Sequence, residues 1–258
     1  MPTVETNGTT LRYELGGDEG RPTIAFIPDL GFGPWVWGWQ APALSGPYRT
    51  LVYAVRGTDG SGRDGPYTID RFSADFEAVL SAAGVRSAHL VGAGLGGMVA
   101  LRYAKDYGRA RSLSLFGTPT SGTAINEDAL DALHPADPSR LRSSLSFAFT
   151  DRFIRDAGVI DRIIEWRRSE DATGDALEGH RTATIEFESG PLYELTLPTR
   201  VFHGVDDPIV PVEAGEALAE KLPRGRFEEV TGKRCCYIEH ATAVTDAIDG
   251  FVDEVEFD

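Results

Sequence analysis

The sequence predicts an α/β fold, with a mostly parallel central sheet, helices on both faces and an inserted helical cap. Short apolar runs alternate with helical patterns through most of the chain, and this alternation is typical of a parallel sheet covered on both faces. The alternation stops between residues 118 and 197, where only helical patterns occur. A length of 258 residues suits one large domain or a core with an inserted cap.

The strands are predicted from short apolar runs bounded by turn residues. Asn7-Gly8 lies between the first two runs and favours a type I′ turn, so the chain is expected to open with a β-hairpin. The predicted strands are residues 4–6, 11–15, 23–27, 51–55, 87–91, 112–116, 200–203 and 227–230. Apolar residues three and four apart predict helices over 69–80, 95–103, 217–222 and 244–251.

The middle of the chain has a different organisation. Its apolar residues recur at helical intervals and no run alternates as a strand would. We therefore predict a core formed by residues 1–119 and 196–258, with a helical cap formed by residues 120–195.

Composition excludes several classes of partner. With 40 acidic against 25 basic residues, the net charge of −15 disfavours nucleic acid and anionic membrane surfaces. Two adjacent cysteines make no disulfide framework, and the first residues lack the pattern of a signal peptide. No spacing of metal ligands occurs. These observations predict a cytoplasmic protein without metal or cofactor that acts on a small molecule, with its oligomeric state left open.

A glycine-rich stretch, VGAGLGGMVA at residues 91–100, allows two interpretations. As G-x-G-x-x-G it would hold a dinucleotide, but that loop belongs to the first βαβ unit and needs an acid about 20 residues further on. Here several strands come first, and no acid lies between Arg109 and Thr123. As G-x-S-x-G it would be a nucleophile elbow in which glycine replaces serine. The second interpretation is favoured.

Three other loops support the elbow. Residues 24–37 (IAFIPDLGFGPWVW) hold a strand, a glycine-containing loop and two tryptophans, residues 56–61 read RGTDGS, and residues 203–211 read HGVDDPIVP. In this order, with residues 92–96, they resemble the oxyanion loop, RGxGxS loop, elbow and acid loop of the α/β-hydrolase fold superfamily. The resemblance is to its capped lactonase- and epoxide-hydrolase-like branch, and it implies the α/β-hydrolase fold.

The chain departs from that family at the positions of its chemistry. Gly94 stands where the resemblance places the serine, and Arg234 stands where it places the histidine. Pro28-Asp29 replaces the His-Gly pair of the oxyanion loop, so Asp207 alone remains of the triad. Glycine has no attacking atom; it either relaxes a strained turn that no longer does chemistry or leaves a site that polarises carbonyls without a nucleophile.

Three charged residues are the candidate catalytic groups: Asp29, Asp207 and Arg234. Asp29 could fill the oxyanion donors, act as a protonated acid or cap its loop. Asp207 could act as a base or cap its own loop, and we favour an ion pair between it and Arg234. The amides of Leu30 and Leu95 are the candidate oxyanion donors, because Leu95 opens a helix.

Substrate contacts are predicted around the same loops. The candidate substrate-binding residues are Leu30, Phe32, Trp35, Trp37, Gly94 and Leu95, although the aromatic side chains could equally be core. Cys235 and Cys236 are expected to be inert and His203 structural. Three cap residues, His134, His180 and Trp166, could reach the site, but the sequence does not place them.

The function expected from this site is not hydrolysis. We expect an enzyme that catalyses a cofactor-independent cyclisation, lyase or isomerase step on an apolar small molecule, for example in natural-product biosynthesis. One alternative is an inactive pseudo-hydrolase that binds a ligand or a protein. The other is a hydrolase with relocated catalytic groups, in which Asp29 or Asp207 activates water.

Overall fold

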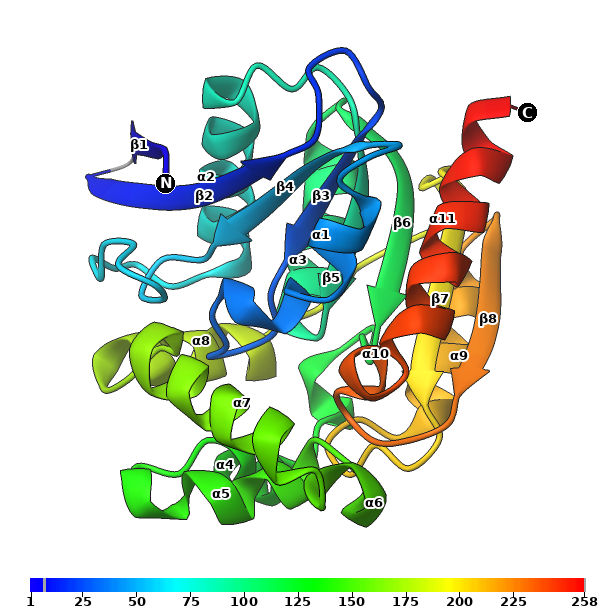
Figure 1. Ribbon diagram of the computed structural model, residues 1–258. Coiled ribbons are helices and arrows are strands. Elements are labelled where there is room, and N and C mark those ends of the chain that lie inside the picture. Colours follow the sequence, from blue (N-terminus) through cyan, green and yellow to red (C-terminus); the bar gives the residue numbers. More distant parts are fainter. Residues whose placement is uncertain (7, 258) are drawn as a thin grey trace.

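A computed structural model describes residues 1–6 and 8–257 of the chain (Figure 1). Its eight-stranded sheet has the order β1-β2-β4-β3-β5-β6-β7-β8. The strands are β1 (Thr3–Thr6), β2 (Thr9–Gly16), β3 (Thr23–Ile27), β4 (Arg49–Ala54), β5 (Ala88–Ala93), β6 (Ala110–Phe116), β7 (Thr199–Gly204) and β8 (Gly225–Val230). All eight predicted strands are present, and Asn7 of the predicted turn lies outside the described residues.

The sheet is antiparallel only at its first edge. β1 pairs with β2 and β2 with β4 in antiparallel register, while all the other neighbours are parallel. Every residue of β3, β4 and β5 is buried, because helices cover both faces of a parallel sheet. The mostly parallel sheet predicted from the sequence is therefore confirmed.

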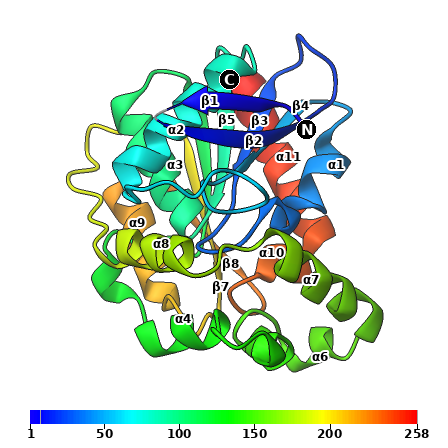
Figure 2. The same cartoon turned by 90° about the vertical axis from the view of Figure 1, so that its left-hand side faces the viewer.

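The helices of the core form two layers (Figure 2). One layer holds α2 (Ile69–Ala82), α3 (Leu95–Asp106) and α9 (Val212–Lys221), and the other holds α1 (Gln40–Leu44) and α11 (Ala241–Phe257). Two short helices, η1 (Pro34–Trp37) and α10 (Cys236–Glu239), lie in loops beside the second layer. The apolar stripes of α2 and α11 are buried and face the sheet.

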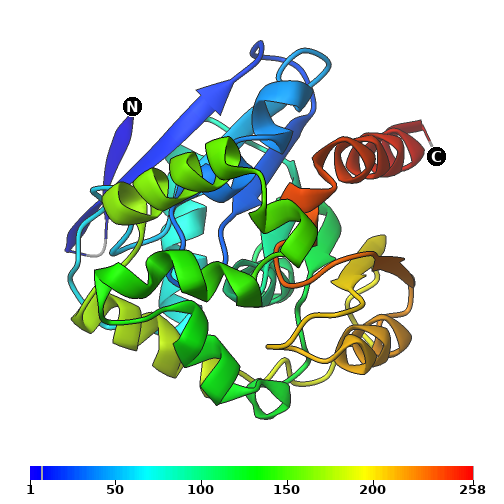
Figure 3. The same cartoon turned by 60° about the horizontal axis from the view of Figure 1, so that its bottom comes forward.

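Between β6 and β7 the chain forms helices and one isolated bridge, Ser121 to Glu188. The α-helices are α4 (Glu127–Leu133), α5 (Leu141–Ser144), α6 (Asp151–Ile154), α7 (Ala157–Glu170) and α8 (Asp175–Ile185), and the 3-10 helices are η2 (Gly122–Ala124), η3 (Pro138–Arg140) and η4 (Leu145–Phe147). We call this stretch, residues 120–195, the cap segment. It lies across the carboxyl ends of the strands (Figures 1 and 3).

Backbone hydrogen bonds tie the end of α7 to two core loops. The Ala172 amide donates to the Gly31 carbonyl at 2.8 Å, and the Asp59 amide donates to the Glu170 carbonyl at 2.8 Å. The cap segment is thus anchored beside the loops that follow β3 and β4. Within residues 1–6 and 8–257, no helix is long and apolar enough to cross a membrane.

Candidate active site

The glycine-rich stretch is a sharp turn from β5 into α3. Gly94 has φ +45° and ψ −111°, a conformation that side-chain-bearing residues rarely adopt. Its amide donates to the Phe116 carbonyl at 2.8 Å, which holds the turn against β6. A Cβ atom on Gly96 would overlap the backbone carbonyl of Ile27, so α3 starts in direct contact with the end of β3. The turn therefore has the geometry of a nucleophile elbow without a nucleophile.

The carboxylate of Asp29 occupies the two candidate oxyanion donors. Its Oδ1 accepts hydrogen bonds from the Leu30 amide at 2.7 Å and from the Leu95 amide at 3.0 Å. Asp29 is buried, and it lies at the amino end of α3, where the helix dipole favours a negative charge. The amides that the sequence identified as carbonyl-polarising donors are thus already bonded to an anion of the protein.

Arg234 closes the other side of this turn. Its Nε donates to Asp29 Oδ2 at 2.7 Å, and its Nη2 donates to Asp29 Oδ1 at 3.1 Å. Its Nη1 donates to the Gly117 carbonyl at 2.7 Å and to Asp207 Oδ2 at 3.2 Å. Burial alone would lower the pKa of Arg234, but the carboxylates of Asp29 and Asp207 outweigh burial and raise that pKa. The guanidinium is therefore a permanent cation between two carboxylates.

Asp207 is held in its own loop as well as by the arginine. Its Oδ1 accepts from the amides of Ile209 at 2.8 Å and Val210 at 3.2 Å. His203 donates from Nε2 to the Val210 carbonyl at 2.9 Å, and its pKa is lowered by burial, so it is a neutral structural residue. The favoured ion pair between Asp207 and Arg234 is present in the structure, and Asp29 shares the same cation.

Together these residues form a buried cluster, Asp29–Arg234–Asp207, which we call the ion triad. A Cβ atom at Gly94 would overlap both Asp29 Oδ1 and Arg234 Nη2. The triad thus fills the space that a nucleophilic side chain would need and occupies the donors that a developing oxyanion would need. Acyl transfer to this turn, as in a serine hydrolase, is not available to this arrangement.

The two cysteines offer no substitute nucleophile. Burial raises the pKa of the Cys235 thiol to about 12, and burial also raises the pKa of Cys236. Both residues are buried and free. Because the thiolate is the reactive form, neither sulfur is nucleophilic near neutral pH.

This burial predicts a simple thiol count. A chromogenic disulfide reagent at pH 8 is expected to titrate no thiol in the folded protein and two after unfolding in guanidinium chloride. Rapid reaction of one thiol in the folded protein would show that Cys235 or Cys236 is more accessible than the structure indicates.

A cavity of about 730 Å³ opens inside the cap segment, between α4, α5 and the end of α7. Its lining includes Leu30 of the oxyanion loop, His134 after α4 and Arg167 of α7. The His134 ring lies 4.9 Å from the Phe32 ring between centroids, and a Cβ atom on Gly31 would lie 2.9 Å from His134 Nδ1. This cavity therefore reaches the oxyanion loop from the cap side.

His134 is the one histidine of the cap segment with free nitrogens. Among the described residues neither of its ring nitrogens has a hydrogen-bond partner. Burial, and after it the charges of Arg167 and Arg234, lower the pKa of His134 well below its usual value, so the ring is neutral. His180, in contrast, accepts from the Gly31 amide at 3.2 Å and bonds the Arg56 carbonyl at 2.8 Å, which makes it a structural link.

Arg167 was not anticipated from the sequence. Its Nε donates to Asp171 Oδ2 at 2.8 Å, Nη1 to Ser144 Oγ at 3.0 Å and Nη2 to the Leu133 carbonyl at 3.0 Å. Three of its five N–H groups thus have partners among the described residues, and its guanidinium lies 5.0 Å from the Phe32 ring centroid. The sequence does contain one signal for Arg167: it lies on the apolar stripe of α7, where a charged residue is rare unless it has a partner.

The predicted aromatic contacts divide between two places. Phe32 faces His134 and Arg167 beside the cap cavity. Trp35 and Trp37 do not line that cavity; they line a separate groove, with Trp166, on the other side of η1. The ring of Trp37 is fully buried and packs into the core against Phe26, Phe116 and Tyr237. Contact of Leu30, Phe32, Gly94 or Leu95 with a substrate stays a prediction.

Comparisons with known proteins agree with this architecture. A family model described as "Alpha/beta hydrolase family" matches residues 24–247. The 3-oxoadipate enol-lactonase 1 of Acinetobacter baylyi is 25% identical over 255 residues, covering 96% of this chain and 95% of the relative.

Solved structures give the same result. An enol-lactonase from Burkholderia xenovorans LB400 superposes with a TM-score of 0.85 at 24% identity, covering 98% of this chain and 100% of that one. A hydrolase from Pseudomonas aeruginosa PA01 superposes with a TM-score of 0.84 at 26% identity, covering 97% of each chain.

These relatives correct the function expected from the sequence. The Acinetobacter baylyi relative is named a lactonase and the Pseudomonas aeruginosa structure a hydrolase, which contradicts the expectation of a non-hydrolytic cyclase, lyase or isomerase. That expectation rested on the missing serine and on amides free to polarise a carbonyl, whereas Asp29 occupies both amides. The matched length, the eight-stranded sheet and the turn at Gly94 show that the chain belongs to the alpha/beta hydrolase family.

Proposed function

We propose that this protein is a hydrolase of a small ester or lactone bound in the cap cavity, with water as the nucleophile. The observation that carries the proposal is that His134 and Arg167 both line this cavity. A neutral imidazole with free nitrogens can accept a proton from water, and a guanidinium with unpaired N–H groups can bind a developing oxyanion. The names of the relatives support the substrate class.

The chemistry follows from these two groups. His134 takes a proton from water as the water oxygen attacks the carbonyl carbon, and the carbonyl electron pair moves to the oxygen bound by Arg167. When the tetrahedral intermediate collapses, the alkoxide leaving group takes the proton back from His134. The products are a carboxylic acid, which ionises in solution, and an alcohol. Asp171 and Ser144 position the guanidinium.

The cap cavity is a better place for this reaction than the turn at Gly94. In the ion triad both carboxylates are bonded to Arg234 and to backbone amides, so neither is a free base. This argues against the alternative in which Asp29 or Asp207 activates water. His134 carries no such competing bond among the described residues.

The first test replaces His134 with asparagine. Loss of the general base should lower kcat for a panel of small lactones and p-nitrophenyl esters by about 10²–10⁴-fold, while His240→Asn should leave it unchanged because His240 lies outside the cap cavity. Since the pKa of His134 is lowered, its base form persists below pH 6.5, and kcat should stay flat from pH 6 to pH 8.

Two results would overturn the proposal. One is the absence of hydrolysis across the panel by the wild-type protein, even where a panel member raises its Tm. The other is covalent labelling of the wild-type protein by a fluorophosphonate, detected by intact mass, since that reagent reports an activated serine. Far-UV circular dichroism of His134→Asn guards against loss of folding.

A further inference from the structure

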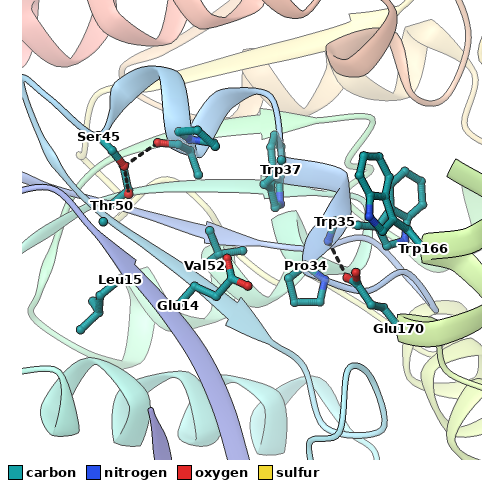
Figure 4. A pocket seen from close by; sticks show the side chains of 14 residues that line it. Glu14, Leu15, Pro34, Trp35, Trp37, Ser45, Thr50, Val52, Trp166 and Glu170 are labelled. Carbon is teal, nitrogen blue, oxygen red and sulfur yellow. Dashed lines mark hydrogen bonds between the residues drawn. The ribbon is translucent and has the colours of Figure 1, made fainter. Parts of the chain in front are cut away.

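A second concave site lies on the outer side of η1, away from the cap cavity. It is a groove of about 480 Å³ between the sheet strands β2 and β4, the helices η1 and α1, and the end of α7. We call it the edge groove. Its lining and that of the cap cavity have no residue in common, so the two sites are separate. Figure 4 shows its side chains from close by.

Two carboxylates without ion-pair partners among the described residues project into the edge groove. Glu14 comes from β2, and Glu170 comes from the end of α7 (Figure 4). Asp59 is near both but pairs with Arg12, whose Nη1 is 3.6 Å from Asp59 Oδ1. The groove therefore holds two carboxyl groups that no cation in the described part of the chain pairs with directly.

The pKa values reflect this crowding. Burial, and then the like charges of Asp59, Asp171 and Glu14, raise the pKa of Glu170 to about 7, although a hydrogen bond from the Trp35 amide opposes the rise. Burial and the charge of Asp59 also raise the pKa of Glu14, against the smaller opposing effect of Arg12. A cation placed between Glu14 and Glu170 would relieve both effects.

One wall of the groove is apolar. Trp35 and Trp166 stack with centroids 6.3 Å apart and planes at 18°, and Pro34 and Val52 extend the apolar wall (Figure 4). These apolar surfaces can lie against the apolar part of a ligand.

We propose that the edge groove binds a small amphipathic organic ammonium ion. The ammonium group lies between Glu14 and Glu170, and the apolar body lies along Trp35 and Trp166. An inorganic cation would leave the apolar wall unused. A neutral apolar molecule would leave the two carboxylates unpaired.

The test compares 2-phenoxyethylamine with 2-phenoxyethanol by titration calorimetry at pH 8. The two probes have the same size and the same ether oxygen, and differ in the ammonium charge. The wild-type protein should bind the amine at least ten-fold more tightly than the alcohol. Intrinsic fluorescence should change on binding, because three tryptophans line the groove.

Charge-removing variants locate the binding. Glu14→Gln together with Glu170→Gln should abolish the preference for the amine, whereas Glu216→Gln, on α9 outside the groove, should leave it intact. The amide oxygen of the glutamine introduced by Glu170→Gln can still accept from the Trp35 amide, so the fold is retained. The double variant should melt no lower than the wild-type protein, because two repelling charges are removed.

The pH dependence of amine binding provides an independent test. Because the pKa of Glu170 is about 7, the wild-type protein should bind the amine more weakly at pH 5.5 than at pH 8, and Glu170→Gln should flatten this dependence. Equal affinity for the two probes, or a preference for the amine that survives in the double variant, would overturn the assignment. Neither outcome depends on whether the protein hydrolyses esters.

Discussion

Arg234→Met is expected to lower the free energy of unfolding by about 3–5 kcal/mol, the usual cost of removing one partner from a buried ion pair. Both carboxylates of the ion triad would remain buried and lose their cation, and the Gly117 carbonyl would lose its donor. For a chain of this length that corresponds to a fall in Tm on the order of 10 °C. Denaturant unfolding followed by circular dichroism measures it.

Two control variants make this result specific. Arg226→Met breaks the exposed pair with Glu254 and should cost less than about 1 kcal/mol. Asp29→Asn combined with Arg234→Met should recover part of the loss, because the side-chain oxygen of the introduced asparagine can still accept from the amides of Leu30 and Leu95. If Arg234→Met is no more costly than Arg226→Met, the ion triad is not a structural element of the fold.

Gly94→Ser is expected to destabilise the protein and to give no serine hydrolase. The new side chain would adopt a conformation that costs on the order of 1–3 kcal/mol. Its Cβ atom would also overlap Asp29 Oδ1 and Arg234 Nη2, which are held by hydrogen bonds on several sides. We expect a total loss of at least about 2 kcal/mol and no covalent labelling by a fluorophosphonate.

A triple variant is the matched comparison for Gly94→Ser. Gly94→Ser with Asp29→Gly and Arg234→His removes the ion triad, frees the amides of Leu30 and Leu95 and places a histidine near the serine. This variant should be labelled by the fluorophosphonate where the single variant is not. Labelling of Gly94→Ser alone would mean that the side chains of the ion triad are easily displaced and do not block the turn.

Most of the fold could be predicted from the sequence because its signals are local. The alternation of apolar runs with helical stripes marked all eight strands, and the loops at 92–96 and 203–211 marked the carboxyl ends of β5 and β7. Such ends meet at one edge of a parallel sheet. That is why Asp29, Asp207 and Arg234, far apart in the chain, could be proposed as neighbours.

The hydrogen bonds and ion pairs among these three residues could not be predicted in full. The sequence left three roles open for Asp29, because a carboxylate at that position can cap a loop, hold a proton or accept from amides. The choice depends on the position of Arg234, which reaches Asp29 across 205 residues of sequence. The function expected from free amides was wrong for the same reason.

The sequence by itself determined the sheet, its helical layers and the loss of a side chain at Gly94, since these depend on periodicity and on residue identity. The tertiary structure alone decided that Arg234 binds Asp29 as well as Asp207, that His134 and Arg167 line one cavity, and that Glu14 and Glu170 line another. Charge pairing and cavities arise between segments that are remote in the chain, and their energies depend on distance and burial, which no local pattern encodes.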